Sequence, residues 1–172
     1  MRRLAWLSLA LSVSCKTVPP PVQMVVNPPP KLSDCPGDIR TTEEIEGDWL
    51  VHERIHVVGG GVDESYQLVL QKTGPKLVLL ALTPFGAKAF SVTQIGVQTW
   101  TESYLGPILP VPPENVLRDV QRAHFRVVDD PGLDPRQVTR DADGAVHIDA
   151  EKCGYKATLA PVSANLIPPP AR

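Results

Sequence analysis

The stretch KLVLLALTPFGAKAF, residues 76–90, decides the fold of this chain. Leu77 to Leu82 is the most apolar run after residue 14, and turn-forming residues, Thr83 to Gly86, end it. A second β-like run, Ala87 to Ile95, follows directly. The pattern predicts a hairpin at the centre of a curved antiparallel sheet. Because residues 77–82 are apolar on both faces, we expect both faces of that strand to be covered.

Further strands are predicted on both sides of this hairpin. Apolar and polar residues alternate in segments 48–58, 64–71 and 97–104, and glycine-containing turns separate them. These segments extend the hairpin to five strands in meander order. Closer to the C-terminus, segments 137–140 and 145–149 flank the turn sequence DADG, and a last strand follows at 153–160.

Residues 114–125 form the one segment with clear helical periodicity. Five of its residues make a single stripe: Val116, Leu117, Val120, Ala123 and His124. Such a helix needs a sheet face against which to pack. The expected fold class is therefore mainly β (α+β), a strongly curved antiparallel half-barrel covered by one or more helices.

The N-terminus has the pattern of an export signal. Two arginines precede an apolar run, Leu4 to Val13, which is too short to span a bilayer. Small residues lead up to Cys15, which resembles a bacterial lipobox, in which the cysteine carries the lipid anchor. The alternative is an ordinary signal cleaved nearby, which leaves a free thiol. Since Lys16 rather than Asp follows the cysteine, the resemblance implies the periplasmic face of the outer membrane.

Proline content divides the rest of the chain. Residues 1–14 are the predicted signal, and residues 15–34 contain two PPP runs typical of an extended tether. Residues 35–161 form one predicted domain, and residues 162–172 form a proline-rich tail. If Cys15 carries lipid, Cys35 and Cys153 remain, and an even pair in an oxidising compartment predicts a disulfide. Two separate buried thiols are the alternative.

Residues 52–56, HERIH, followed by Gly59, match the HExxHxxG pattern of zinc proteases. That chemistry needs a helix, in which both histidines lie on one face. The flanking residues favour a strand, in which His52 and His56 stand about 13 Å apart. Val62 occupies the place of a third ligand. We therefore expect no enzyme activity, no cofactor and no metal site, with a zinc hydrolase as the remote alternative.

The net charge of −2 comes without a basic patch, which argues against nucleic acid as a partner.

Three segments together resemble a known family: LVLLALTPFGAKAF, WTESYLGPILP and PPENVLRDVQRAHF, which lie within residues 77–125. The family is a group of short, uncharacterised proteobacterial lipoproteins, often encoded beside genes for fatty-acid or aryl-polyene synthesis. More distantly, the pattern is similar to LolB, the outer-membrane lipoprotein receptor, and to LolA, its periplasmic carrier. The resemblance implies a bent half-barrel whose helices cover an apolar cavity for acyl chains. The sequence departs from the LolB pattern in that it has no clear amphipathic first helix.

The expected function is that of an outer-membrane lipoprotein that binds or hands over a lipid or acyl chain. Its expected partner is the membrane, which it contacts through the N-terminal lipid anchor. The predicted cavity-lining residues are Trp49, Tyr66, Leu68, Leu70, Phe90, Val92, Trp100, Val116, Leu117 and Val120. The same side chains could instead fill a solid core, as in a structural or assembly lipoprotein without a ligand. The resemblance implies that Phe85 is an exposed apolar tip that faces the membrane. The more ordinary expectation is that Phe85 folds back over the barrel end.

Overall fold

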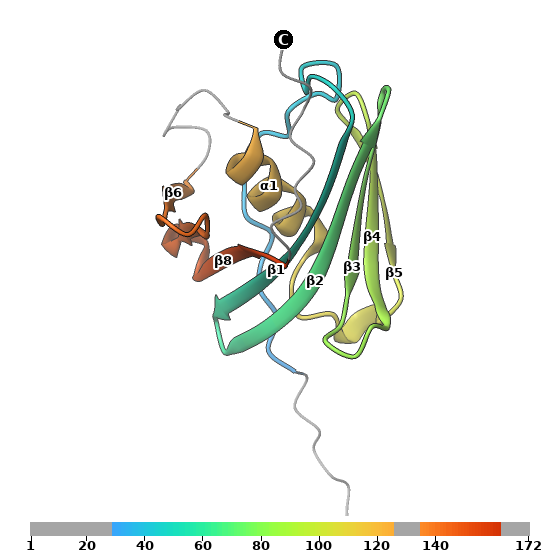
Figure 1. Cartoon of the computed structure of the whole chain (residues 1–172). Helices are drawn as coiled ribbons and strands as arrows, with labels where there is room; N and C mark the ends of the chain where they lie inside the picture. The colour runs from blue at the N-terminus through green and yellow to red at the C-terminus, as the bar shows by residue number, and fades with distance from the viewer. Residues whose placement is uncertain (1–28, 126–134, 163–172) are drawn as a thin grey trace, which may run out of the picture.

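The computed structural model describes residues 29–125 and 135–162 (Figure 1). The predicted signal, Cys15, most of the tether and nearly all of the tail lie outside the described residues. The described chain forms one eight-stranded antiparallel sheet in the order β5-β4-β3-β2-β1-β8-β7-β6, with one α-helix. The elements are β1 (Trp49–Gly59), β2 (Val62–Thr73), β3 (Lys76–Leu82), β4 (Lys88–Ile95), β5 (Gln98–Ser103), η1 (Gly106–Ile108), α1 (Pro113–His124), β6 (Gln137–Arg140), β7 (Val146–Ala150), η2 (Glu151–Cys153) and β8 (Tyr155–Pro161).

The predicted meander of β1 to β5 is confirmed. The central hairpin pairs β3 with β4, with Leu79 directly opposite Val92, and both side chains are fully buried. Buried and exposed residues alternate along β1 from Val51 to Val58, as its sequence pattern predicts. The antiparallel, mainly β fold class is therefore as expected.

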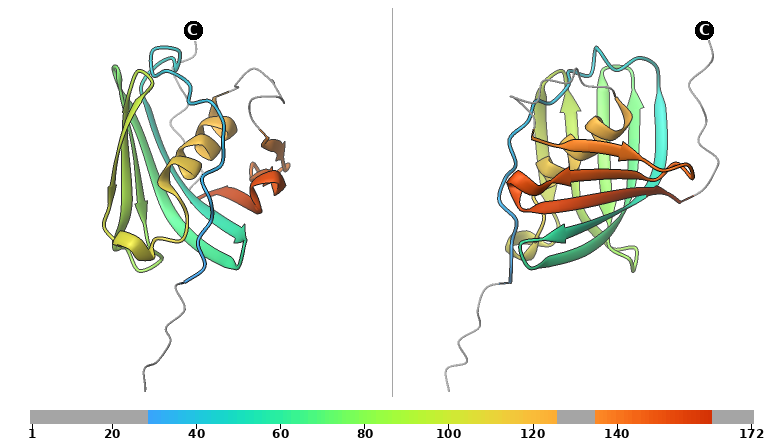
Figure 2. Two further views of the ribbon diagram at one scale, coloured as in Figure 1. Left: turned by 180° about the vertical axis from the view of Figure 1, so that it is seen from behind. Right: turned by 90° about the vertical axis from the view of Figure 1, so that its left-hand side faces the viewer.

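The C-terminal strands complete the sheet by a long-range pairing. Strand β8 lies between β7 and β1, with Leu159 opposite both Ile55 and Val146. The sheet curls as it passes from β1 to β8, so that β6, β7 and β8 run across the other side of α1 from β2 to β5 (Figure 2). The helix consequently lies inside the curve, between the two arms of an open sheet.

The outer face of β3 differs from the expectation. Leu77, Leu79 and Ala81 point into the curve and are fully buried. Val78 and Leu80, on the opposite face, are half-buried, and α1 lies on the inner side alone (Figure 2). The prediction that both faces of this strand are covered is wrong. The outer side chains of this strand are therefore partly open to solvent.

The compact part of the chain also begins before the predicted boundary at Cys35. Leu32 is 5% exposed and belongs to the core, and its backbone N–H donates to the carbonyl of Pro110 over 2.8 Å. The last residues of the proline-rich segment therefore pack against the loop that precedes α1.

Candidate functional site

The inner face of the curved sheet, covered by α1, collects most of the predicted lining residues. Eight of the ten are no more than 2% exposed: Tyr66, Leu68, Leu70, Phe90, Val92, Val116, Leu117 and Val120. Trp49 is half-buried at the rim, where its ring meets Phe125 edge to face at 5.1 Å between centroids. The stripe on the helix and the inner faces of the strands thus meet as the periodicity predicts.

Trp100 does not belong to this set. It lies on β5 directly opposite Thr93, one residue along β4 from the inward-facing Val92. Since paired residues share a face of the sheet, Trp100 is on the outside, and it is 51% exposed. The prediction that Trp100 lines a cavity is wrong, because the register of β5 places the ring on the convex face.

Tightly packed side chains occupy this interface. Three hollows are bounded by described residues, and none of the three is bounded by more than one of the predicted lining residues. The hollow that reaches Tyr66 has a volume of about 300 Å³ and is otherwise formed by Arg54, Ser65, Gln67 and Pro84. Of these three hollows, only this one reaches a predicted lining residue.

Amide side chains attach α1 to the rest of the fold. Gln121 donates to the side-chain oxygen of Gln94 over 2.6 Å and accepts from the backbone N–H of Arg40 over 2.8 Å. One turn and a half earlier, Asn115 accepts from the N–H of Cys35 over 2.8 Å and donates to the carbonyl of Ser33 over 2.9 Å. The N-terminal segment is thus tied to the helix at two places.

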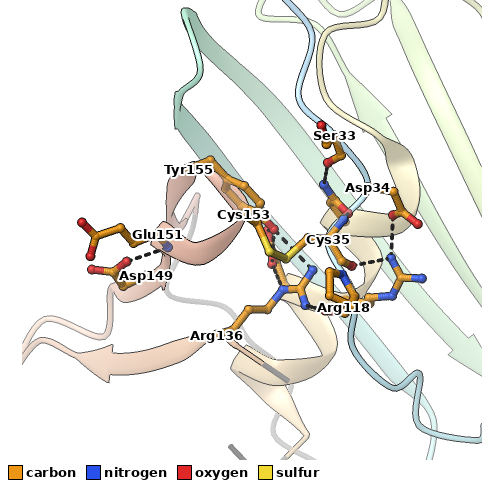
Figure 3. Close-up of a disulfide and its surroundings, with 12 residues drawn as sticks. Ser33, Asp34, Cys35, Arg118, Arg136, Asp149, Glu151, Cys153 and Tyr155 are labelled. Carbon is orange, nitrogen blue, oxygen red and sulfur yellow. Dashed lines mark hydrogen bonds and ion pairs between the residues drawn. A yellow bond between two sulfur atoms is a disulfide. The ribbon is translucent and has the colours of Figure 1, made fainter. Parts of the chain in front are cut away.

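The predicted disulfide between Cys35 and Cys153 is confirmed (Figure 3). It joins residues 118 positions apart, with their Cα atoms separated by 5.5 Å. Cys35 lies in the N-terminal segment, and Cys153 ends η2, immediately before β8. The bond closes a long loop, which restricts the unfolded chain more than the folded one.

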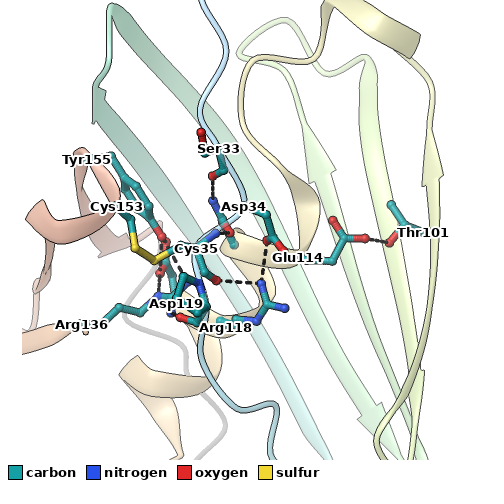
Figure 4. Close-up of polar contacts among 12 residues, drawn as sticks. Ser33, Asp34, Cys35, Thr101, Glu114, Arg118, Asp119, Arg136, Cys153 and Tyr155 are labelled. Atoms are coloured by element: carbon teal, nitrogen blue, oxygen red, sulfur yellow. Dashed lines mark hydrogen bonds and ion pairs between the residues drawn. A yellow bond between two sulfur atoms is a disulfide. The ribbon is translucent and has the colours of Figure 1, made fainter. Parts of the chain in front are cut away.

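A buried ion pair lies next to the disulfide (Figure 4). Arg136 donates through Nε to Oδ1 of Asp119 over 2.6 Å and through Nη1 to the carbonyl of Pro36 over 2.8 Å. The hydroxyl of Tyr155 donates to both carboxylate oxygens of Asp119, at 3.0 and 3.1 Å. Burial, together with the charge of Asp119, raises the pKa of Tyr155 above its usual range. We call Asp119, Arg136 and Tyr155 the Asp119 cluster.

Sequence reasoning missed the Asp119 cluster. The available signal was small: Asp119 lies three residues after Val116, on the side of the helix that was expected to be apolar. Nothing in the local pattern around Arg136 indicates that its side chain is fully buried. The three residues meet through long-range packing alone.

The HERIH segment lies on β1, as predicted. His52 and His56 point outward and are exposed, whereas Glu53 points inward and is 4% exposed. His56 pairs through Nε2 with Asp63 at 2.7 Å. The helical geometry of a zinc protease is therefore not formed. Within residues 29–125 and 135–162, no three His, Cys, Asp or Glu side chains gather closely enough to hold a metal ion.

Glu53 interrupts the apolar alternation of β1, and its partner is on the helix. Oε2 of Glu53 lies 3.0 Å from Nε2 of His124, at the C-terminal end of α1. The other carboxylate oxygen, Oε1, is buried and has no hydrogen-bond partner among the described residues. The hydroxyl of Tyr66, on β2, is likewise buried and has no hydrogen-bond partner among the described residues. These two polar atoms are the unusual feature of the inner face.

Phe85 is 96% exposed at the turn between β3 and β4. The expectation that it folds back over the barrel end is therefore wrong. The same end of the molecule holds η1, where Ile108 is 60% exposed, and residue 29, where the described chain begins (Figure 1). Close packing of Pro30 against Gly61 confirms that the chain enters beside the β1–β2 turn.

No helix in the described part of the chain combines the length and apolar character needed to cross a bilayer. Comparison with curated proteins found no match. Comparison with protein families matches residues 51–162, from β1 to the end of β8, to a family described as "Protein of unknown function (DUF3261)". Because this match covers more than half of the chain and nearly the whole sheet, the protein belongs to the DUF3261 family.

Proposed function

We propose that this protein is a lipoprotein of the outer membrane, anchored through Cys15 on the periplasmic side, and that its LolB-like half-barrel binds or hands over a lipid or acyl chain. The observation that carries the proposal is the apolar inner face of an open sheet with one amphipathic helix across it. An open sheet can admit a long apolar molecule between its two arms when the helix moves away. Such a site is selective through apolar contact and needs no catalytic group.

The arrangement of one end of the molecule supports a membrane-facing role. Phe85 and Ile108 are exposed apolar residues at the end from which the tether leaves the domain at residue 29. Exposed apolar side chains that gather at one place on a protein mark sites of contact with membranes or partner proteins. In the proposal, the anchor and the tip meet the same bilayer, and a ligand passes between the bilayer and the inner face.

The first experiment is mass spectrometry. The intact mass of membrane-extracted protein should include acyl groups on a chain that begins at Cys15. Lipid that co-purifies with the protein should be released by organic extraction. A mature chain without lipid at Cys15 contradicts the anchor, and the absence of any bound lipid or acyl chain contradicts the carrier role.

The second experiment tests the tip. In a chain carrying Cys15→Ser, which cannot be lipidated, Phe85→Glu should abolish binding to liposomes and leave the melting temperature nearly unchanged, since the side chain is exposed. The matched control is Val97→Glu, at a position that is 66% exposed in the turn between β4 and β5, at the opposite end of the strands. Equal loss of liposome binding in both variants would contradict a specific role of Phe85.

A structural or assembly lipoprotein without a ligand is the second candidate. The observation that favours it is the close packing of the inner face, where eight of the predicted lining residues are no more than 2% exposed. A neutral fluorescent probe such as N-phenyl-1-naphthylamine separates the two candidates. A carrier should bind the probe and release it to long-chain lipids, whereas a solid core should bind none.

A further inference from the structure

Two neighbouring residues of the inner face each have a buried polar atom without a partner among the described residues. The carboxylate oxygen Oε1 of Glu53 and the hydroxyl of Tyr66 have no hydrogen-bond partner among the described residues. Glu53 is opposite Leu68 on β2, and Tyr66 is opposite the next inward residue of β1, Ile55. The two are therefore diagonal neighbours on one face, a separation that side chains of this length can span.

Leaving such groups unpaired is costly. A buried polar atom without a partner costs about 1–3 kcal/mol relative to one that is paired, and native proteins have few. Glu53 is 4% exposed and Tyr66 is 2% exposed, so bulk water does not solvate either side chain. The remaining oxygen of Glu53 is already engaged by His124, so the free oxygen is held in a fixed position.

The chemistry of the two atoms is complementary to one kind of group. The carboxylate oxygen can only accept a hydrogen bond, and the phenol can donate one. Burial raises the pKa of Tyr66 above its usual range, so this phenol keeps its proton at neutral pH. A hydroxyl group donates one hydrogen bond and accepts others, and it can therefore satisfy both atoms at once. A carboxylate would instead be repelled by Glu53.

We propose that Glu53 and Tyr66 form a recognition site for a hydroxyl group carried by an apolar ligand, with the hydroxyl donating to Oε1 of Glu53 and accepting from Tyr66. This inference rests on the proposed lipid-binding function and narrows its ligand to hydroxyl-bearing lipids. The apolar part of the ligand contacts the surrounding inner-face residues, beginning with Leu68 and Phe90. Phe90 already meets the ring of Tyr66 edge to face at 5.7 Å.

The test compares two probes that differ only in the group on the oxygen, which is a hydrogen in one and a methyl in the other. Dodecan-1-ol and its methyl ether, each below its solubility limit, compete with N-phenyl-1-naphthylamine for the full chain. The alcohol should displace the fluorescent probe at a concentration about tenfold lower than the ether, which corresponds to one well-formed hydrogen bond. Dodecanoate at pH 8 should be weaker than the alcohol because its charge meets Glu53.

Two variants locate the effect. Glu53→Gln should reduce the alcohol-to-ether ratio to within about threefold, because the ether lacks the hydrogen that Glu53 accepts. Tyr66→Phe should weaken the alcohol and the ether alike by about tenfold, because the oxygen of each accepts from the phenol. Tyr104→Phe is the matched control, because Tyr104 is 48% exposed, and it should keep the wild-type ratio. The phenylalanine variant keeps the ring and its packing, so it remains informative if Glu53→Gln folds poorly.

The outcomes separate this inference from the function on which it rests. Displacement by alcohol and ether at equal concentrations, an unchanged ratio in Glu53→Gln, or unchanged binding of the alcohol in Tyr66→Phe overturns the hydroxyl site while lipid binding stands. If no long-chain probe displaces N-phenyl-1-naphthylamine, or the fluorescent probe does not bind, the carrier function fails and the hydroxyl site fails with it.

Discussion

Removing the carboxylate of the Asp119 cluster should strongly destabilise the fold. In Asp119→Ala, Arg136 loses the partner that its Nε contacts at 2.6 Å, and the hydroxyl of Tyr155 loses both of its acceptors. The side chain of Arg136 is 0% exposed, so water cannot replace the lost contacts without opening the fold. Removing one partner of a buried ion pair costs about 3–5 kcal/mol.

The measurement is equilibrium unfolding in urea without reductant, so that the disulfide stays intact, followed by circular dichroism. Asp119→Asn keeps the shape but removes the charge, and should cost about 1.5–3 kcal/mol. The double variant Asp119→Leu with Arg136→Met removes both charges at similar volume and should be far less damaging than Asp119→Ala. The control is Asp149→Ala, which breaks an exposed pair with Lys156 and should change the free energy of unfolding little.

Two results would refute this reasoning. If Asp119→Ala costs less than about 1 kcal/mol, the arginine is not held in a dry site by this carboxylate. If the double variant is as unstable as Asp119→Ala, the damage comes from lost packing and not from the broken ion pair.

Three further predictions concern the inner face and one turn. Tyr66→Phe should raise the free energy of unfolding of the ligand-free protein by about 1 kcal/mol, because the hydroxyl is buried without a partner among the described residues. A lower urea midpoint in this variant would contradict the prediction. Burial raises the pKa of both Tyr66 and Tyr155, so only the unfolded chain ionises these tyrosines as the pH passes about 10. Their contribution to the free energy of unfolding should therefore be constant below that pH and fall above it. Urea midpoints between pH 8 and 11 measure this fall, and Tyr66→Phe should make it shallower. Gly59→Ala should lower the free energy of unfolding by more than about 3 kcal/mol, since φ is +147° and the new methyl carbon would lie 2.2 Å from the carbonyl oxygen of Gly154. The control is Gly47→Ala, at φ +74° in open space, which should cost about 1–2 kcal/mol. Equal costs would show that a small shift relieves the close approach at Gly59.

The sequence by itself was sufficient for the elements whose signal is local. The alternation in β1 and β2, the apolar runs of β3 and β4 and the stripe of α1 each predicted the right kind of element, because one buried face imposes a period of two or 3.6 on nearby residues. The same reasoning placed HERIH on a strand. The cysteine count and the predicted export signal together predicted the bond between Cys35 and Cys153, since that inference needs no geometry.

Tertiary structure decided which distant segments meet. Pairing of β8 with β1 joins segments about a hundred residues apart in the chain, which no local period encodes. The register of a strand decides whether an aromatic residue on it points inward. The sequence pattern of β5 is compatible with either face for Trp100, and the pairing with β4 places the residue on the outside. The exposed tip at Phe85, the Asp119 cluster and the unpaired atoms of Glu53 and Tyr66 likewise depend on packing between elements, because burial and hydrogen bonding are properties of the assembled fold and not of any single segment.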